Sequence, residues 1–346
     1  MKHTVFAKTP VKYILNTVCT AAVITLLVLL TSGGALNNYQ TDLLKLIGIN
    51  IILAVSLNLA AGFLGQLPLG HAGFMSIGAY AAALFSKSVA LPANIEFPMA
   101  LLVGGLFAAA FGVIIGLPAL RLHGDYLAIL TLGFGEIIRV IIQNMTITGG
   151  ASGLRGIEKH TSIFWVYLMV AATIFVITTF IRSRHGRAVL AIREDEIAAE
   201  ASGIPTTRYK VMAFTISAFF AGIAGGLYAH YLSILDAANF GFMKSVEILV
   251  MVVLGGLGSI IGSVVAATGL TLLPELLRGF SDYRMVIYSL LLVVVMIFKP
   301  SGLFGKYDFS LGGTLDSAIL WLRSPNKFHT VREKIAKLKS KKGGKA

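Results

Sequence analysis

Charged residues are scarce in this chain, at 13% of the sequence, and two groups of them could act on a partner or a solute. The denser group is residues 182–208, with five arginines and four acidic residues. The other is Glu136 and Arg139 within an apolar run. Their spacing of three residues places both charges on one helix face, where they can pair. We prefer a structural ion pair, with Arg139 reaching toward the outer end of its helix, over a substrate contact.

The segment 182–208 reads as a docking element. Its arginines favour the cytoplasmic side of a membrane. A short helix is predicted over residues 193–204, closed by Gly203 and Pro205. Acidic residues 194–196 crowd its start, where the helix dipole favours anions. A narrow apolar stripe follows at Ile197, Ala201 and Ile204. Such a helix suits a groove on another protein, and packing against its own loop is the alternative that residue types leave open.

Two glycine-rich segments interrupt the apolar runs, at residues 62–71 and 254–262. Segments broken by glycine or proline are the best pointer to a transport pathway in a membrane bundle. Close helix packing through small residues is the alternative, and three glycine pairs have the small-xxx-small spacing. The candidate pathway residues are Gly70, His71, Gly73, Glu136, Arg139, Gly255, Gly256 and Gly258. For His71 we favour a satisfied packing role over a ligand role.

No constellation for catalysis is found in the sequence. There is no Gly-x-x-x-x-Gly-Lys-Ser/Thr, and the nearest fragment, residues 302–307, has the wrong spacing and no Ser or Thr. The seven histidines are scattered without metal-ligand spacing. Cys19 is the only cysteine, so no intrachain disulfide can form. We therefore expect no enzyme activity, no bound cofactor and no metal in this chain.

The composition indicates a membrane protein that must position these groups within lipid. The 346 residues are 56% hydrophobic, with a mean hydropathy of +0.82. This excludes an ordinary soluble domain and predicts an all-α polytopic bundle, because backbone groups in lipid must bond within their own helix. The charge of +13 does not indicate nucleic acid, since positive-inside topology accounts for much of it. A retained first helix is preferred over a cleaved signal peptide.

Counting crossings sets the expected topology. The apolar runs are about 13–31, 43–61, 68–86, 98–117, 125–143, 161–181, 209–232, 245–254, 259–274 and 284–298. Ten crossings, with a break at Gly255–Gly258 and discontinuous or re-entrant helices, leave both termini in the cytoplasm. The expected domains are a transmembrane domain at 1–306, with a cytoplasmic loop at 182–208, and a basic cytoplasmic tail at 307–346. A stretch at 318–322 could lie at the lipid interface.

Several stretches together resemble a known family. Residues 193–203 look like the cytoplasmic coupling loop of ABC-transporter permeases. Residues 69–80, 121–139, 148–157, 253–262 and 298–305 resemble the LivM-type permeases of branched-chain amino-acid importers. The resemblance covers about 45 to 305. It implies that the coupling-loop residues meet an ATPase: Arg193, Glu194, Asp195, Glu196, Ile197, Ala198, Ala199, Gly203 and Ile204.

The resemblance also implies partners and a function. It implies a second homologous permease, two ABC ATPases that use ATP, and an external solute-binding protein, in a bacterial or archaeal plasma membrane. The expected substrates are leucine, isoleucine and valine. One alternative is the same machine carrying urea, amides or other amino acids. An ion-coupled secondary transporter is a second, with Glu136 as its one clear buried carboxylate, and a passive channel is a third.

Overall fold

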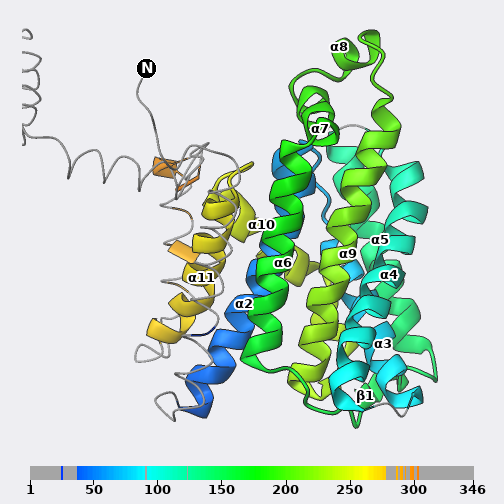
Figure 1. Ribbon diagram of the computed structural model, residues 1–346, viewed down its shortest axis with the longest axis vertical. Coiled ribbons are helices and arrows are strands. Elements are labelled where there is room, and N and C mark those ends of the chain that lie inside the picture. The colour runs from blue at the N-terminus through cyan, green and yellow to red at the C-terminus, as the bar shows by residue number, and fades with distance from the viewer. Residues whose placement is uncertain are drawn as a thin grey trace, which may run out of the picture. The chain divides into compact units, whose positions relative to one another are not determined.

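The described helices pack side by side as a bundle, with α7 and α8 at one end (Figure 1). The computed structural model describes residues 37–89, 92–122 and 124–277, with Thr25 and a few residues between 286 and 303. The predicted runs 13–31 and 284–298, the tail 307–346 and its stretch 318–322 lie outside the continuous described ranges. The described helices, short 3-10 and π turns (η) and strands are α2 (Asn38–Asn58), η1 (Leu59–Phe63), α3 (His71–Ser88), α4 (Ala93–Ala119), α5 (Asp125–Asn144), η2 (Gly150–Ser152), β1 (Leu154–Arg155), α6 (Ile163–Arg182), α7 (Arg184–Glu194), α8 (Glu196–Ala201), α9 (Thr206–Leu232), β2 (Ile234–Leu235), η3 (Ala237–Phe240), α10 (Phe242–Gly255) and α11 (Ile260–Leu276).

The regular secondary structure of the described residues is helical, with one two-residue strand pair, β1–β2. Four described stretches are long and apolar enough to cross a membrane, namely Asn38–Phe63, Asn94–Ala119, Ile163–Arg182 and Thr206–Leu232. The length fits because about 20 helical residues span a hydrocarbon core of ~30 Å. This agrees with the predicted all-α membrane bundle.

α2 is the core helix. Every residue from Ile47 to Asn58 is buried. α2 packs against α6, α9, α10 and α11. A helix enclosed on all sides needs apolar or small residues around its whole circumference, and the polar exceptions here bond to neighbouring helices. Asn50 Nδ2, for example, donates to Thr271 Oγ1 on α11 at 2.9 Å.

α3, α4 and α9 pack closely through glycine. A Cβ added to Gly78 on α3 would overlap the backbone of Gly222 on α9, and one added to Gly225 would overlap the carbonyl of Met75. Glycine lets helix backbones approach closely and so increases their van der Waals contact. Such contact matters in a membrane, because the hydrophobic effect does not drive helices together in lipid. The predicted packing role of the small-xxx-small pair at Gly222 and Gly226 is confirmed.

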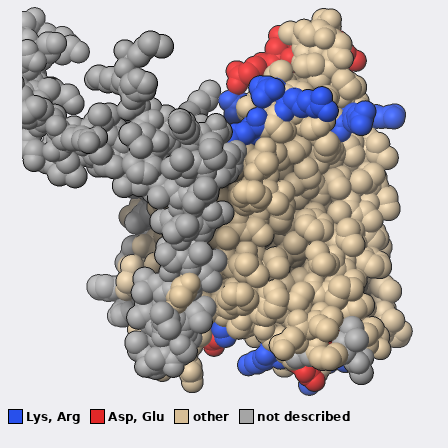
Figure 2. Space-filling view, in the orientation of Figure 1, with Lys and Arg blue, Asp and Glu red and all other residues tan. Residues whose placement is uncertain are grey.

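The bundle has two distinct ends. At the first, called the loop end here, α7 lies beside η1 and the connection between α10 and α11, and α8 lies beyond α7. At the second, the strand end, β1 pairs with β2, and Lys87 Nζ donates to the carbonyl of Arg155. On the face shown in Figure 2, Lys and Arg form a band near the loop end, acidic side chains lie beyond it, and the broad surface below is uncharged. That pattern suits a helix bundle whose flank faces lipid and whose loop end faces water.

Candidate functional site

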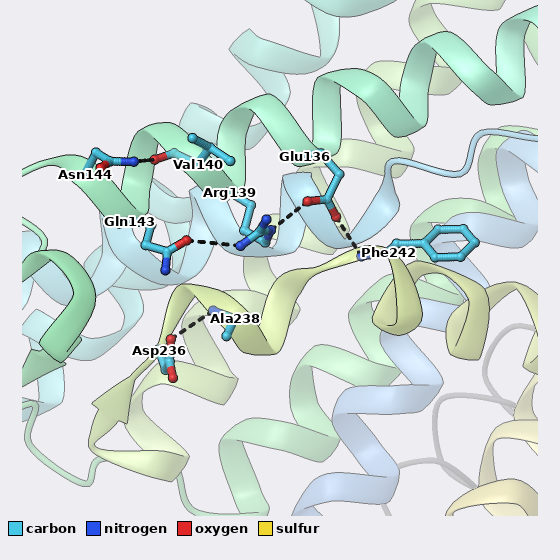
Figure 3. A network of polar contacts seen from close by, with 8 residues as sticks. All are labelled: Glu136, Arg139, Val140, Gln143, Asn144, Asp236, Ala238 and Phe242. Carbon is cyan, nitrogen blue, oxygen red and sulfur yellow. Dashed lines mark hydrogen bonds and ion pairs between the residues drawn. The ribbon is translucent and has the colours of Figure 1, made fainter.

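α5 carries a polar network half-way along its length (Figure 3). Arg139 Nε donates to Glu136 Oε2 at 2.6 Å, and Arg139 Nη1 donates to Gln143 Oε1 at 3.0 Å. The predicted ion pair is confirmed. Glu136 also accepts a bond from the backbone N–H of Phe242 at 2.9 Å, through its Oε1 atom. Phe242 is the first residue of α10, so the carboxylate satisfies an unpaired donor and complements the positive end of the helix dipole.

α10 begins beside the middle of α5. It has 14 residues and is therefore ~21 Å long at 1.5 Å per residue, short of the ~30 Å core. Its first residue meets Glu136, which lies at the middle of the 20-residue α5. The predicted break after Gly255 is also present, since α10 ends there and α11 starts at Ile260. The prediction of discontinuous helices is correct for this pair.

The start of α3 lies beside α5 as well. A Cβ on Gly70 would overlap the carbonyl of Thr131, and one on Gly73 would come 3.0 Å from Cα of Gly135. His71 is 2% exposed, and its Nε2 lies 3.0 Å from Ser56 Oγ. His71 is therefore buried and hydrogen-bonded within the bundle. Ser245 Oγ of α10 accepts the N–H of Ala72 at 3.1 Å, so the starts of α3 and α10 are joined.

A narrow crevice separates these elements. Its lining includes Gly73, Glu136, Phe240, Phe242 and Ser245. Two predicted pathway residues, Gly73 and Glu136, thus meet at one place. Phe240 and Phe242 were not predicted; Phe240 ends the 3-10 turn η3 and Phe242 begins α10, and the positions of both depend on the tertiary fold.

The predicted pathway residues near the break form a second cluster. Gly255 packs against Gly262 so closely that a Cβ on either would overlap the other's backbone. Gly256 and Gly258 have φ values of 110° and 84°, which favour glycine. Asn58 Oδ1 accepts the Gly258 N–H at 2.9 Å. The pathway residues therefore fall into two groups, one at mid-depth and one at the loop end.

The loop 182–208 differs from its prediction in one respect. The prediction of a single helix over residues 193–204 is wrong. The chain instead forms α7 and α8, with Asp195 in an extended conformation between them. Asp195 Oδ1 accepts the N–H of Ala198 at 3.0 Å and caps α8. An N-cap aspartate stops one helix and starts the next, since its side chain replaces a missing backbone partner. Arg193 and Glu194 consequently end α7 instead of starting the docking helix.

α8 is held to the bundle by a buried ion pair. Lys210 of α9 is 1% exposed, and its Nζ donates to Glu196 Oε1 at 2.5 Å. The sequence interpretation missed Lys210. The sequence does hold a signal for this pair. Lys210 is a single lysine at the start of the apolar run 209–232, and the acidic residues 194–196 precede it closely enough to bond to it. Ala199 is buried on the same helix.

The remaining face of α8 is open. Ile197 is 82% exposed, and Ala198 and Ala201 are exposed too. Of the predicted stripe, Ile204 is partly buried against the core. Gly203 has a φ of 82° directly after the helix, the conformation that glycine supplies at helix ends. The loop thus presents a small apolar surface of Ile197, Ala198 and Ala201, called the α8 surface below.

Among the described residues, no group of three or more His, Cys, Asp or Glu side chains lies close enough to hold a metal ion. Glu136 pairs with Arg139, and Glu196 pairs with Lys210.

Comparison with known proteins adds a family to this geometry. Residues 39–298 match the family described as the permease component of the branched-chain amino acid transport system. The chain belongs to this family. The permease family accounts for the membrane bundle, and the resemblance inferred from the sequence is confirmed.

Individual relatives within the permease family refine the assignment. The high-affinity branched-chain amino acid transport system permease protein LivM of Escherichia coli is 40% identical over 297 residues, covering 76% of this chain and 69% of LivM. LivH of the same organism is 24% identical over 283 residues, covering 74% and 91%. BraD of Pseudomonas aeruginosa is 26% identical over 286 residues, with the same two shares. The higher identity groups the chain with LivM-type permeases. No solved structure matches the chain.

Proposed function

We propose that this chain is a membrane subunit of an ATP-driven importer for leucine, isoleucine and valine in the plasma membrane. The names of the relatives support the substrate class, since LivM, LivH and BraD are all permeases of branched-chain amino-acid systems. One organism has both a LivM and a LivH, which supports a pathway formed with a second homologous permease.

The exposed α8 surface is the observation that carries the energetic part of this proposal. Ile197 is 82% exposed beside the exposed Ala198 and Ala201, and a partner that covered this apolar surface would gain free energy from its burial. The Asp195 cap and the Glu196–Lys210 pair hold that helix in place, so its apolar face is preorganised. A groove on an ABC ATPase would cover it, and ATP would then be used in trans.

Movement follows from the connections of the loop. α6 runs into α7 through Ser183, which caps α7, and α8 leads through Gly203 into α9. Closure of two ATPases on ATP would displace α8 and move α6 and α9 with it. The pathway would then change from outward-facing to inward-facing, as a population shift driven by differential nucleotide binding.

The mid-depth crevice has no room for a water molecule in this structure, so an amino acid with an aliphatic side chain would pass there only after α3, α5 and α10 separate. Its lining is mostly glycine and apolar, and its one carboxylate is already compensated by Arg139. Gly70, His71 and Gly73 at the start of α3 border the same region. An external solute-binding protein would deliver the amino acid at the strand end.

The topology belongs to the same proposal. Ten crossings, with both termini and the loop 182–208 inside, agree with the positive charge of the loop and of the tail 307–346. We retain 1–306 as the permease domain, with no cofactor bound by this chain.

Transport by reconstituted vesicles tests the function. The chain is reconstituted with its second permease, ATPases and binding protein, and uptake of labelled leucine, urea and acetamide is compared with and without ATP. We expect ATP-dependent uptake of leucine alone. Uptake of urea or acetamide in place of leucine would transfer the proposal to another substrate, and leucine uptake on an ion gradient without ATPases would refute it.

Two variants test the α8 surface. Ile197→Glu places a charge in the expected apolar contact and should reduce ATP-driven uptake at least about tenfold, because an unpaired buried charge costs several kcal/mol. Thr207→Glu adds the same charge in the exposed first turn of α9 and is the matched control. Equal uptake by both variants would contradict docking at α8.

A further inference from the structure

Arg193 faces the interior of the protein, away from the α8 surface. Its Nη1 donates to the carbonyl of Gly62 at 2.8 Å, and its Nη2 donates to Glu194 Oε1 at 2.9 Å. Gly62 lies in the π-helical turn that ends α2. The side chain of Arg193 is 20% exposed, whereas that of Glu194 is 70% exposed. The guanidinium therefore lies between water on one side and the end of the core helix on the other.

Two glycines make room for this side chain. A Cβ on Gly65 would come 2.7 Å from Arg193 Cγ, and a Cβ on Gly258 would come 3.2 Å from Arg193 Nη1. Gly65 and Gly258 both have positive φ values, so larger residues there would be strained as well as crowded. The arginine thus contacts η1, the turn after it, and the α10–α11 break.

Asn58 fastens η1 to that break. Its Nδ2 donates to the carbonyl of Ser259 at 3.0 Å and to Ser263 Oγ at 2.9 Å. Its Oδ1 accepts the N–H of Gly258 at 2.9 Å. Asn58 is fully buried, so these bonds are shielded from water and any shift of η1 must carry the break with it.

The other end of this chain of contacts is the docking loop. Arg193 is in the last turn of α7, whose Gly186, Val189 and Ile192 are buried. Only Asp195, in an extended conformation, separates α7 from α8. A displacement of α8 therefore reaches Arg193 within two residues along the backbone.

We propose that Arg193 is a positioning residue that transmits movement of α8 to the α10–α11 break through the carbonyl of Gly62. The inference rests on the proposed docking of an ATPase at α8 and adds the route by which docking acts on the pathway. It also gives Arg193 a different role from direct contact with the ATPase. Arginine suits the role because its planar guanidinium can donate to Gly62 and Glu194 at the same time.

Cysteine reactivity in the assembled transporter tests the route. In a Cys19→Ser background, Leu257→Cys reports on the break, where Leu257 is 39% exposed, and Ala198→Cys reports on α8. Each protein is assembled with its partner subunits, and its labelling rate by a maleimide is measured with and without a non-hydrolysable ATP analogue. We expect nucleotide to change the rate at Leu257→Cys, and we expect the ATPase to protect Ala198→Cys.

Arg193→Gln and Arg193→Met remove the bond to Gly62, and Met keeps the apolar stem against Gly65. Both should abolish the nucleotide response at Leu257→Cys and lower uptake about tenfold, while ATP hydrolysis continues and Ala198→Cys stays protected. Losing a charged hydrogen bond of this kind is enough for a change of that size. Arg187→Gln, on the exposed side of α7, should behave like the parent protein.

Each alternative outcome has a defined meaning. A normal response at Leu257→Cys in either Arg193 variant, with uptake within about twofold of the parent, overturns the inference. Failure of both variants to assemble assigns Arg193 a structural role and overturns it too. An unprotected Ala198→Cys in the parent complex would instead refute docking at α8, and with it the proposed function.

Discussion

At the scale of single residues, the Glu196–Lys210 pair shows how this protein holds an exposed helix with few contacts. Lys210 is buried, and Glu196 is its partner from a helix of six residues. An isolated helix of six residues is unstable, because the conformational entropy lost in nucleating it exceeds the free energy gained from the hydrogen bonds of one turn. Its position therefore depends on the ion pair and on the Asp195 cap.

We expect Glu196→Gln to destabilise the protein by about 3 kcal/mol, because it leaves a buried ammonium without its counter-charge. Glu194→Gln is the matched control, and since Glu194 is exposed we expect a loss of ~1 kcal/mol or less. Thermal unfolding of the purified protein in detergent measures both. Similar midpoints for the two variants would show that Lys210 finds another partner.

A second residue-scale prediction separates the two bonds of Glu136. Glu136→Gln keeps an oxygen to accept the Phe242 N–H but loses the charge opposite Arg139. Glu136→Ala loses both interactions. We expect Glu136→Ala to be less stable than Glu136→Gln by ~1 kcal/mol, the value of one cap. Equal stabilities in thermal unfolding would mean that the carboxylate does not cap α10.

At the scale of elements, the contact between α3 and α9 depends on glycine where the backbones touch. Gly78→Ala must push these helices apart, because its Cβ would overlap Gly222. We expect a loss of about 1–3 kcal/mol, the usual cost of overpacking. Gly269→Ala on α11 is the matched control, since nothing lies within 4 Å of the added Cβ.

The control should move in the opposite direction. Alanine in an open helical position gains about 0.5–1 kcal/mol over glycine, because less backbone entropy is lost on folding. Thermal unfolding in one detergent compares Gly78→Ala, Gly269→Ala and the parent protein. A Gly78→Ala variant as stable as the parent would mean that α3 and α9 separate at little cost.

At the scale of the whole molecule, the distribution of charge sets which end faces the cytoplasm. The loop end carries the arginine-rich segment 182–208, and Ser152 lies exposed in η2, between α5 and α6. In the Cys19→Ser background without partner subunits, we expect an impermeant maleimide to label Ser152→Cys in intact cells. Ala198→Cys should react only after the cells are opened, and its labelling in intact cells would invert the topology.

Much of the fold could be predicted from the hydropathy pattern and residue spacing along the chain. Long apolar runs dictate spanning helices, because lipid leaves the backbone no other partners, and the run boundaries from 43 to 274 agree closely with α2–α11. The Glu136–Arg139 pair was predictable because both partners lie on one helix, where spacing fixes distance. The break after Gly255 was predictable from glycine and from the need to return the basic tail inside.

The remaining features depend on contacts between segments far apart in the chain. Lys210 and Glu196 lie on different helices, and Asn58 meets Gly258 across 200 residues, so no local pattern encodes either contact. The sequence by itself determined a membrane bundle with one charged loop, since hydropathy and charge act locally. Only the tertiary structure decided that Arg193 faces inward and that α10 begins against Glu136, because packing fixes those directions.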